Sequence, residues 1–111
     1  MSTSEAAYHL LLEPGDLPVT ALALRLLVDD EAHQPRLRAI TRGVLQRLPE
    51  PSSQHEVLSL ALSPEEMKLT YSALHLLLNA STREDREERE VLHRVLERLP
   101  DEHVMRAIEI R

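Results

Sequence analysis

Apolar and polar residues alternate in three short stretches of this chain. The stretches are residues 8–12, residues 58–62 and residues 107–111, and in each of them apolar side chains recur at every second position. A period of two with one apolar side is typical of a β-strand that is buried on one face. We therefore predict three strands, and the last of them, at about residues 105–111, closes the chain.

Between the strands the apolar residues recur at the spacing of an α-helix. This pattern predicts a first helix over about residues 16–29 and a third over about residues 64–79. The third helix has a clear start, because Ser63 can cap it, Pro64 fits its first position and Glu66 completes a capping box. Both helices are apolar over more than half of their circumference, which is typical of a helix that is buried from two sides.

Each of these helices is followed by another. We expect the second helix to begin at Pro35 and the fourth at Ser81 or Thr82. Both end at a Leu-Pro pair, at Pro49 and Pro100, because proline cannot occupy the interior of a helix. A helical hairpin returns the chain to the end of the sheet that it left, so the strands on either side of it are expected to be antiparallel.

The two halves of the chain resemble each other at an offset of fifty residues. Leu24 corresponds to Leu74, and after one inserted residue the segment 45–49 corresponds to the segment 96–100. A repeat of this length indicates a supersecondary unit that cannot bury its apolar face alone.

The predicted architecture is a single α+β domain over residues 1–111. Two β-α-α units, at about residues 7–52 and 56–103, are followed by the closing strand in the order βααβααβ. A small, mostly antiparallel sheet packs against helical hairpins. Three strands about 4.8 Å apart form a sheet roughly 10–15 Å wide, whereas helices pack about 10 Å apart. Four helices are therefore too wide for one face of this sheet.

Two arrangements resolve this mismatch. In one, a compact monomer stacks its helices in a second layer. In the other, which we predict, a homodimer forms a continuous or face-packed sheet and so also covers the edge strands. The residues expected at the interface between copies are all apolar. On the helices they extend the core-facing side, and they are Val19, Leu26, Leu69 and Leu76; on the first strand the residue is Leu11.

Composition narrows the classes of protein. The formal net charge of -6 disfavours general binding to nucleic acid or to an anionic membrane. The chain has no cysteine, and therefore no disulfide or zinc–thiolate site. No signal segment and no apolar run of about 20 residues is present, so we expect a soluble cytoplasmic protein and no membrane partner. A single lysine, Lys68, beside many arginines is typical of a GC-rich bacterial genome.

One candidate polar site lies on the predicted strands. If the repeats are in phase, His9, Ser59 and Glu109 occupy equivalent positions on the face opposite Leu10 and Leu60. A histidine, a serine and a carboxylate are the groups of a hydrolase triad, which needs a nucleophile, a base and an orienting acid within hydrogen-bond reach. Ser59 lacks a sharp elbow and a glycine-rich loop for an oxyanion hole. Three polar residues on the wet face of a sheet are the simpler interpretation.

Two segments contain metal-ligand residue types. Glu90 and His93 have the Glu-x-x-His spacing of di-metal helical bundles, but their counterparts Ala39 and Arg42 are not ligands. Segment 29–33, Asp-Asp-Glu-Ala-His, lacks the spacing and the glycine of a calcium loop. We interpret both segments as solvated charged surface, and we predict no metal ion and no cofactor.

The predicted helix over residues 35–48 is basic and contains no acid. Its arginines are Arg36, Arg38, Arg42 and Arg47. They can contact phosphate or an acidic partner, or they can pair with the acid-rich fourth helix inside the domain or across a dimer. Because the whole chain is net negative, nucleic-acid binding is the less favoured interpretation.

These observations leave three classes of function. The prediction is a non-catalytic protein-interaction or regulatory module that acts as a homodimer and can bind a protein partner, because apolar helix surface is in excess and the sequence identifies no catalytic residue. The first alternative is a small-molecule or metal-binding protein or enzyme with its site at the sheet–helix cleft or the dimer interface. The second is a nucleic-acid accessory protein that uses the basic helix 35–48.

Overall fold

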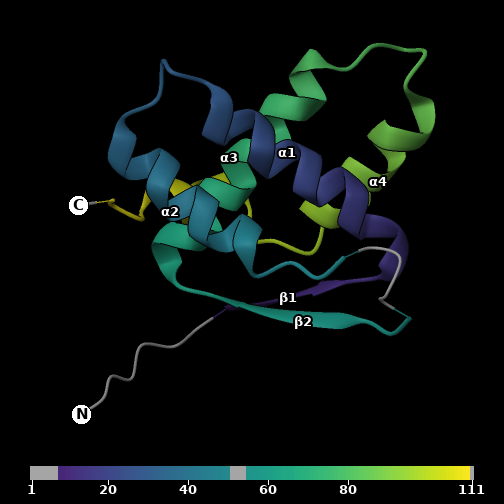
Figure 1. Ribbon diagram of the computed structural model, residues 1–111, viewed down its shortest axis with the longest axis horizontal. Coiled ribbons are helices and arrows are strands. Elements are labelled where there is room, and N and C mark those ends of the chain that lie inside the picture. The colour runs from purple at the N-terminus through teal and green to yellow at the C-terminus, as the bar shows by residue number, and fades with distance from the viewer. Residues whose placement is uncertain (1–7, 51–54, 111) are drawn as a thin grey trace.

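The computed structural model describes residues 8–50 and 55–110 (Figure 1). Within these residues the chain is α+β, as predicted, with five α-helices and one two-stranded antiparallel sheet. The elements follow one another in the order β1, η1, α1, α2, β2, α3, α4 and α5, where η1 (Pro14–Asp16) is a single turn of 3₁₀-helix. None of the described helices is long and apolar enough to cross a membrane.

The strands predicted at the start of each half are confirmed, and they pair with each other. β1 (Tyr8–Leu12) and β2 (Leu58–Leu62) are antiparallel, and Leu10 lies opposite Leu60 at the centre of the pairing. Because side chains alternate along a strand, one face of the sheet is apolar. The side chains that point toward the helices are buried: Leu10, Leu12, Leu60 and Leu62. Those on the opposite face are exposed: His9, Leu11, Ser59 and Ala61.

α1 (Leu17–Asp29) and α3 (Pro64–Ala80) pack against each other at the centre of the helical layer. The capping box predicted at the start of α3 is confirmed. The backbone N–H of Glu66 donates to Oγ of Ser63 (3.1 Å), and the backbone N–H of Ser63 donates to Oε1 of Glu66 (2.9 Å). The first half has no serine at this place, but the backbone N–H of Glu13 donates to Oδ2 of Asp16 (2.9 Å), which corresponds to the bond from Ser63 to Glu66.

α2 (Pro35–Gln46) begins at Pro35, as predicted, and α4 (Arg86–Leu96) begins later than predicted. The delay has a local cause, because Thr82 turns back on the residue that precedes the helix. Its backbone N–H (2.9 Å) and its hydroxyl (3.2 Å) both donate to Oδ2 of Asp85. Both helices end before their Leu-Pro pairs, at Pro49 and Pro100, as predicted.

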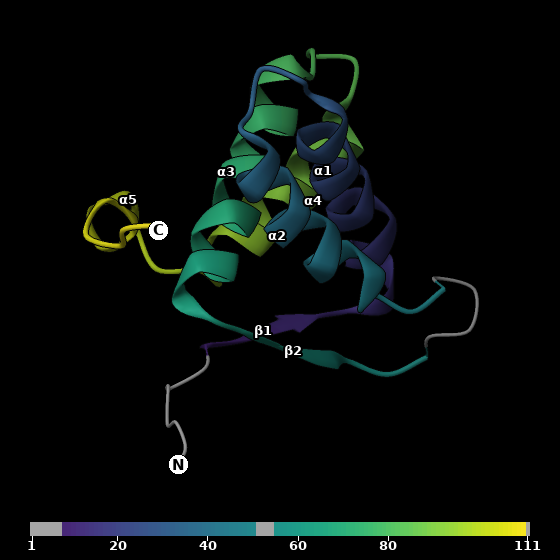
Figure 2. The same ribbon diagram turned by 60° about the vertical axis from the view of Figure 1, so that its left-hand side comes forward.

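The four long helices all lie on one side of the sheet, which forms the floor of the molecule in both views (Figures 1 and 2). α1 contacts α2, α3 and α4, and α3 contacts α2 and α4. The wide apolar arcs of α1 and α3 are therefore covered from two sides by other helices of the same chain. Apart from α3, which contacts β2, the helices pack mainly on one another, so the width of the sheet does not limit their number.

The predicted closing strand at residues 105–111 is wrong. Residues Glu102–Arg106 form α5, which begins where the backbone N–H of Val104 donates to Oδ1 of Asp101 (3.1 Å). Residues 107–110 form no strand, and Arg111 lies outside the described residues. The three-stranded repeat βααβααβ is therefore not confirmed. Alternation over five residues is a weak signal for a strand. The capping residue Asp101 and the buried Met105 favour a helix instead. α5 lies to one side of the helical layer (Figure 2).

Candidate functional site

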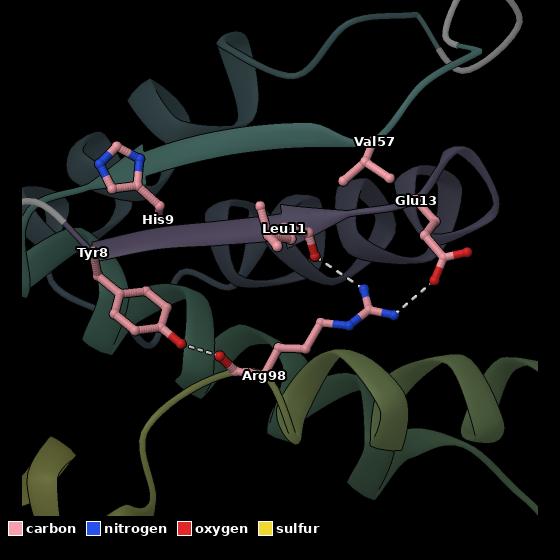
Figure 3. Close-up of a pocket in the computed structure, with 6 residues that line it drawn as sticks. All are labelled: Tyr8, His9, Leu11, Glu13, Val57 and Arg98. Carbon is pink, nitrogen blue, oxygen red and sulfur yellow. Dashed lines mark hydrogen bonds and ion pairs between the residues drawn. The ribbon is translucent and has the colours of Figure 1, made fainter.

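The face of the sheet that the helices leave open contains a shallow hollow of about 430 Å³ beside β1 (Figure 3). The residues that line it are Tyr8, His9, Leu11, Glu13, Val57 and Arg98. Leu11 and Val57 are its apolar walls, and they are 51% and 55% exposed. Large apolar side chains that gather at one exposed place are typical of a surface that a partner covers.

Arg98, just beyond the end of α4, forms the rim of the hollow. Its guanidinium donates to the carbonyl oxygen of Leu11 (2.9 Å) and to the carboxylate of Glu13 (3.0 Å), as Figure 3 shows. It also donates to the carboxylate of Asp16 (2.6 Å). In turn, the backbone carbonyl of Arg98 accepts a hydrogen bond from the hydroxyl of Tyr8. Arg98 is therefore engaged in holding β1 and η1, through three hydrogen bonds of its guanidinium.

Asp16 is the buried anchor behind this rim. Its side chain is 0% exposed, and its carboxylate contacts Arg98 (2.6 Å) and Arg94 (3.0 Å). Burial alone would raise the pKa of this carboxyl. The hydrogen bonds from Arg98, from the backbone of Glu13 and from Arg94, together with the charge of Arg98, outweigh burial and hold the pKa of Asp16 below its ordinary value. Asp16 is therefore an ionised structural group at neutral pH.

The sheet brings together two of the three residues of the predicted polar site. Oγ of Ser59 lies 3.4 Å from Nδ1 of His9 on the exposed face. The register explains this contact, because Ser59 lies opposite Leu11, so it is a diagonal neighbour of His9. Glu109 lies beyond α5, and among the described residues no hydrogen bond or ion pair joins it to His9 or Ser59. This arrangement has no orienting acid, which a serine nucleophile and its base need.

The residues predicted at an interface occupy different environments. Leu69 is a core residue, 3% exposed, and it contributes no surface to an interface. Val19, Leu26 and Leu76 are partly buried against the core. Leu26 and Leu76 nevertheless line one shallow hollow together, so they keep some open surface. Leu11, on the sheet, is the predicted interface residue that is more than half exposed.

Half of the arginines predicted on the basic helix are used inside the fold. Nε of Arg38 donates to the carbonyl oxygen of Val28 (2.8 Å), and Arg89 makes the corresponding bond at the end of α3 (3.2 Å). Carbonyl groups in the last turn of a helix lack partners within the helix, so these arginines satisfy them. The arginines of α2 that remain exposed without such a bond are Arg36 and Arg42.

Arg47, just beyond the end of α2, makes at β2 the contacts that Arg98 makes at β1. Its guanidinium donates to the carbonyl oxygen of Ala61 (2.9 Å) and pairs with the carboxylate of Glu66 (2.9 Å). Each arginine therefore crosses from its own half of the chain to the strand of the other half. The corresponding positions in the two halves are Arg47 and Arg98, Ala61 and Leu11, and Glu66 and Asp16.

The segments with metal-ligand residue types do not converge. Within the described residues, no group of three or more histidines and acids is placed to hold a metal ion. In the acidic loop, Nδ1 of His33 lies 3.3 Å from Oδ2 of Asp30. Glu90 and His93 line a shallow hollow with three arginines, whose positive charge opposes the binding of a cation.

Sequence reasoning missed Asp16 and the two arginines that hold it. The sequence repeat indicates part of this cluster, because it aligns Arg98 with Arg47 and Asp16 with Glu66. Arg94 has no such signal, since its counterpart is Gly43. A comparison of the chain with protein-family models, curated proteins and solved structures found no match.

Proposed function

We propose that this protein is a non-catalytic protein-interaction module that acts as a homodimer, with the open face of its sheet as the contact surface. The observation that carries this proposal is the exposure of Leu11 and Val57 beside the shallow hollow. In a two-fold symmetric contact the same patch faces itself. Leu11 of each copy can then enter the hollow of the other, and both apolar walls leave water.

The charge of the surface supports a contact between identical copies. The whole chain has a formal net charge of -6, which by itself repels a second copy. On the open face, however, Ser59 and Ala61 are uncharged. Glu13, at the margin of the hollow, is paired with Arg98 (3.0 Å). The contact surface is therefore close to neutral.

The size of the surface limits the affinity. A strand of five residues is about 17 Å long, and two strands with their side chains are about 10 Å wide. A stable standard interface buries about 800 Å² on each partner, which is several times the area of this face. We therefore expect a weak, reversible dimer rather than a stable one. The fraction of protein in a weak dimer changes with the protein concentration, and a regulatory module can use this change.

The test is the oligomeric state of matched variants. Size-exclusion chromatography with light scattering over a concentration series is expected to show a monomer–dimer equilibrium for the natural chain and a monomer for Leu11→Glu. Leu22→Glu is the control, because Leu22 is 41% exposed but lies on α1, away from the sheet. A natural chain that stays monomeric through the high micromolar range contradicts the proposal. So does a Leu11→Glu variant that dimerises like the control.

A further inference from the structure

Both strands of the described sheet have a free edge, because the sheet has two strands. In an antiparallel pair, the N–H and C=O groups of alternate residues point away from the partner strand. The carbonyl groups of Leu11 and Ala61 point outward in this way, since each accepts a hydrogen bond from an arginine. An open edge of this kind accepts a strand of another molecule unless something blocks it.

Each edge is occupied by an arginine that is fixed at a second point. Nη1 of Arg47 donates to Ala61, while Nη2 of the same guanidinium pairs with Glu66 (2.9 Å). The Glu66 oxygen that Arg47 contacts also accepts from the backbone of Ser63, so the anchor is itself held by the start of α3. A planar guanidinium with two such contacts has a defined position and orientation.

We propose that Arg47 and Arg98 guard the two free edges of the sheet and prevent a second copy of this chain from adding its strand there. A strand that pairs with β2 must donate a backbone N–H to the carbonyl of Ala61, and Arg47 already occupies this acceptor. To admit the strand, the guanidinium must leave both Ala61 and Glu66. The guards therefore direct self-association away from the edges, and they act whether or not the open face forms a dimer.

The guard at β2 is the weaker of the two. The Arg47 side chain is 42% exposed and its anchor Glu66 is 26% exposed. At β1, the Arg98 side chain is 25% exposed and its anchor Asp16 is 0% exposed. Removal of Arg47 therefore opens one edge and leaves the other guarded. With one edge open, two copies can pair β2 with β2 and close into a four-stranded sheet without further growth.

The experiment compares Arg47→Met with Arg42→Met, both in the Leu11→Glu background so that the open face does not contribute. Arg42 is an exposed arginine of α2, so its replacement removes the same charge without touching the edge. We expect Arg47→Met to show twice the mass of the control by light scattering at equal concentration. We also expect amide hydrogen exchange at Ser59 and Ala61, whose N–H groups face the free edge, to slow by about tenfold or more.

The two readouts separate edge pairing from other association. An Arg47→Met variant with the mass and the exchange rates of the control overturns the proposal, and so does slowed exchange in both variants. If Arg47→Met does not fold by circular dichroism, Glu66→Gln replaces it. This variant keeps an acceptor for the backbone of Ser63 but removes the charge that anchors Arg47, and exchange at Ser59 and Ala61 that equals the control overturns the proposal there too.

Discussion

Replacement of Asp16 by asparagine tests how strongly one buried carboxylate joins the two halves of the chain. Asp16 follows β1 in the first half, whereas Arg94 and Arg98 belong to the second half. Asparagine has the same shape as aspartate, but it removes the charge and turns one acceptor into a donor. One of the two arginines then faces the NH2 group, which cannot accept its hydrogen bond.

The expected loss of stability follows from the burial of the Asp16 carboxylate. Removal of one partner from a buried ion pair costs about 3–5 kcal/mol. The side chains of Arg94 and Arg98 are 48% and 25% exposed, so water can solvate them once the carboxylate is gone. We therefore expect Asp16→Asn to lower the free energy of unfolding by about 3 kcal/mol. Glu66→Gln is the matched control, because Glu66 has one arginine partner and is 26% exposed, and its loss is expected to be about 1 kcal/mol or less.

Urea unfolding followed by far-ultraviolet circular dichroism measures both losses, provided that the m value does not change. A pH series adds an independent check. Because the pKa of Asp16 is lowered in the folded chain, its carboxylate stabilises the fold fully above the unfolded-state pKa of 3.8. This contribution is lost as the pH falls through the lower, folded-state pKa. We expect the gap between the natural chain and Asp16→Asn to stay constant from pH 7 to about pH 5 and to shrink below about pH 4.

Three results would refute this reasoning. The first is a loss well below about 1 kcal/mol for Asp16→Asn, which would mean that the buried pair contributes no more than a surface pair. The second is an equal loss for Asp16→Asn and Glu66→Gln, which would remove burial as the cause. The third is a gap that stays unchanged as the pH falls from 5 to about 2, because a carboxylate with a shifted pKa cannot behave in that way.

Two further predictions concern the core, and both are measured by the same unfolding assay. Leu10 is 0% exposed on β1, and Leu10→Ala is expected to lower the free energy of unfolding by about 3 kcal/mol. Leu22 is 41% exposed on α1, and Leu22→Ala is expected to change it by about 0.5 kcal/mol or less. Similar effects of the two substitutions would contradict the assigned face of the strand. The hydroxyls of Thr20 and Thr70 are buried without a hydrogen-bond partner in the described structure, so Thr20→Val and Thr70→Val are expected to raise the free energy of unfolding by up to about 1 kcal/mol. A loss of more than about 1 kcal/mol in either would show that the hydroxyl has a partner.

Most helices and strands could be predicted because their causes are local. A period of two is complete within residues 8–12 and 58–62, and Ser63 and Glu66 satisfy each other's backbone groups within one turn. The tail shows the limit of this reasoning. Residues 107–110 alternate in the same way but form no strand, since the position of the preceding α5 depends on Met105, which is buried in the core.

The candidate site could be predicted only in part. Alternation places His9, Leu11 and Ser59 on one face as soon as the strands form, and the structure shows all three exposed there. The predicted third strand would place Glu109 on the same face, but the described residues 107–110 form no strand. Leu69 was expected at an interface because its helix is apolar over more than half of its circumference, but the structure places it in the core.

By itself, the sequence determined the order of the first six predicted elements, the buried face of each strand and the correspondence between the two halves. Only the tertiary structure decided how the halves contact each other: Arg47 reaches β2, Arg98 reaches β1, and Asp16 becomes a buried anchor. The physical reason is that these contacts depend on distance and burial across the fold. Asp16 and Arg98 are 82 residues apart in the chain, and no local periodicity records that they meet at 2.6 Å or that the carboxylate is buried there.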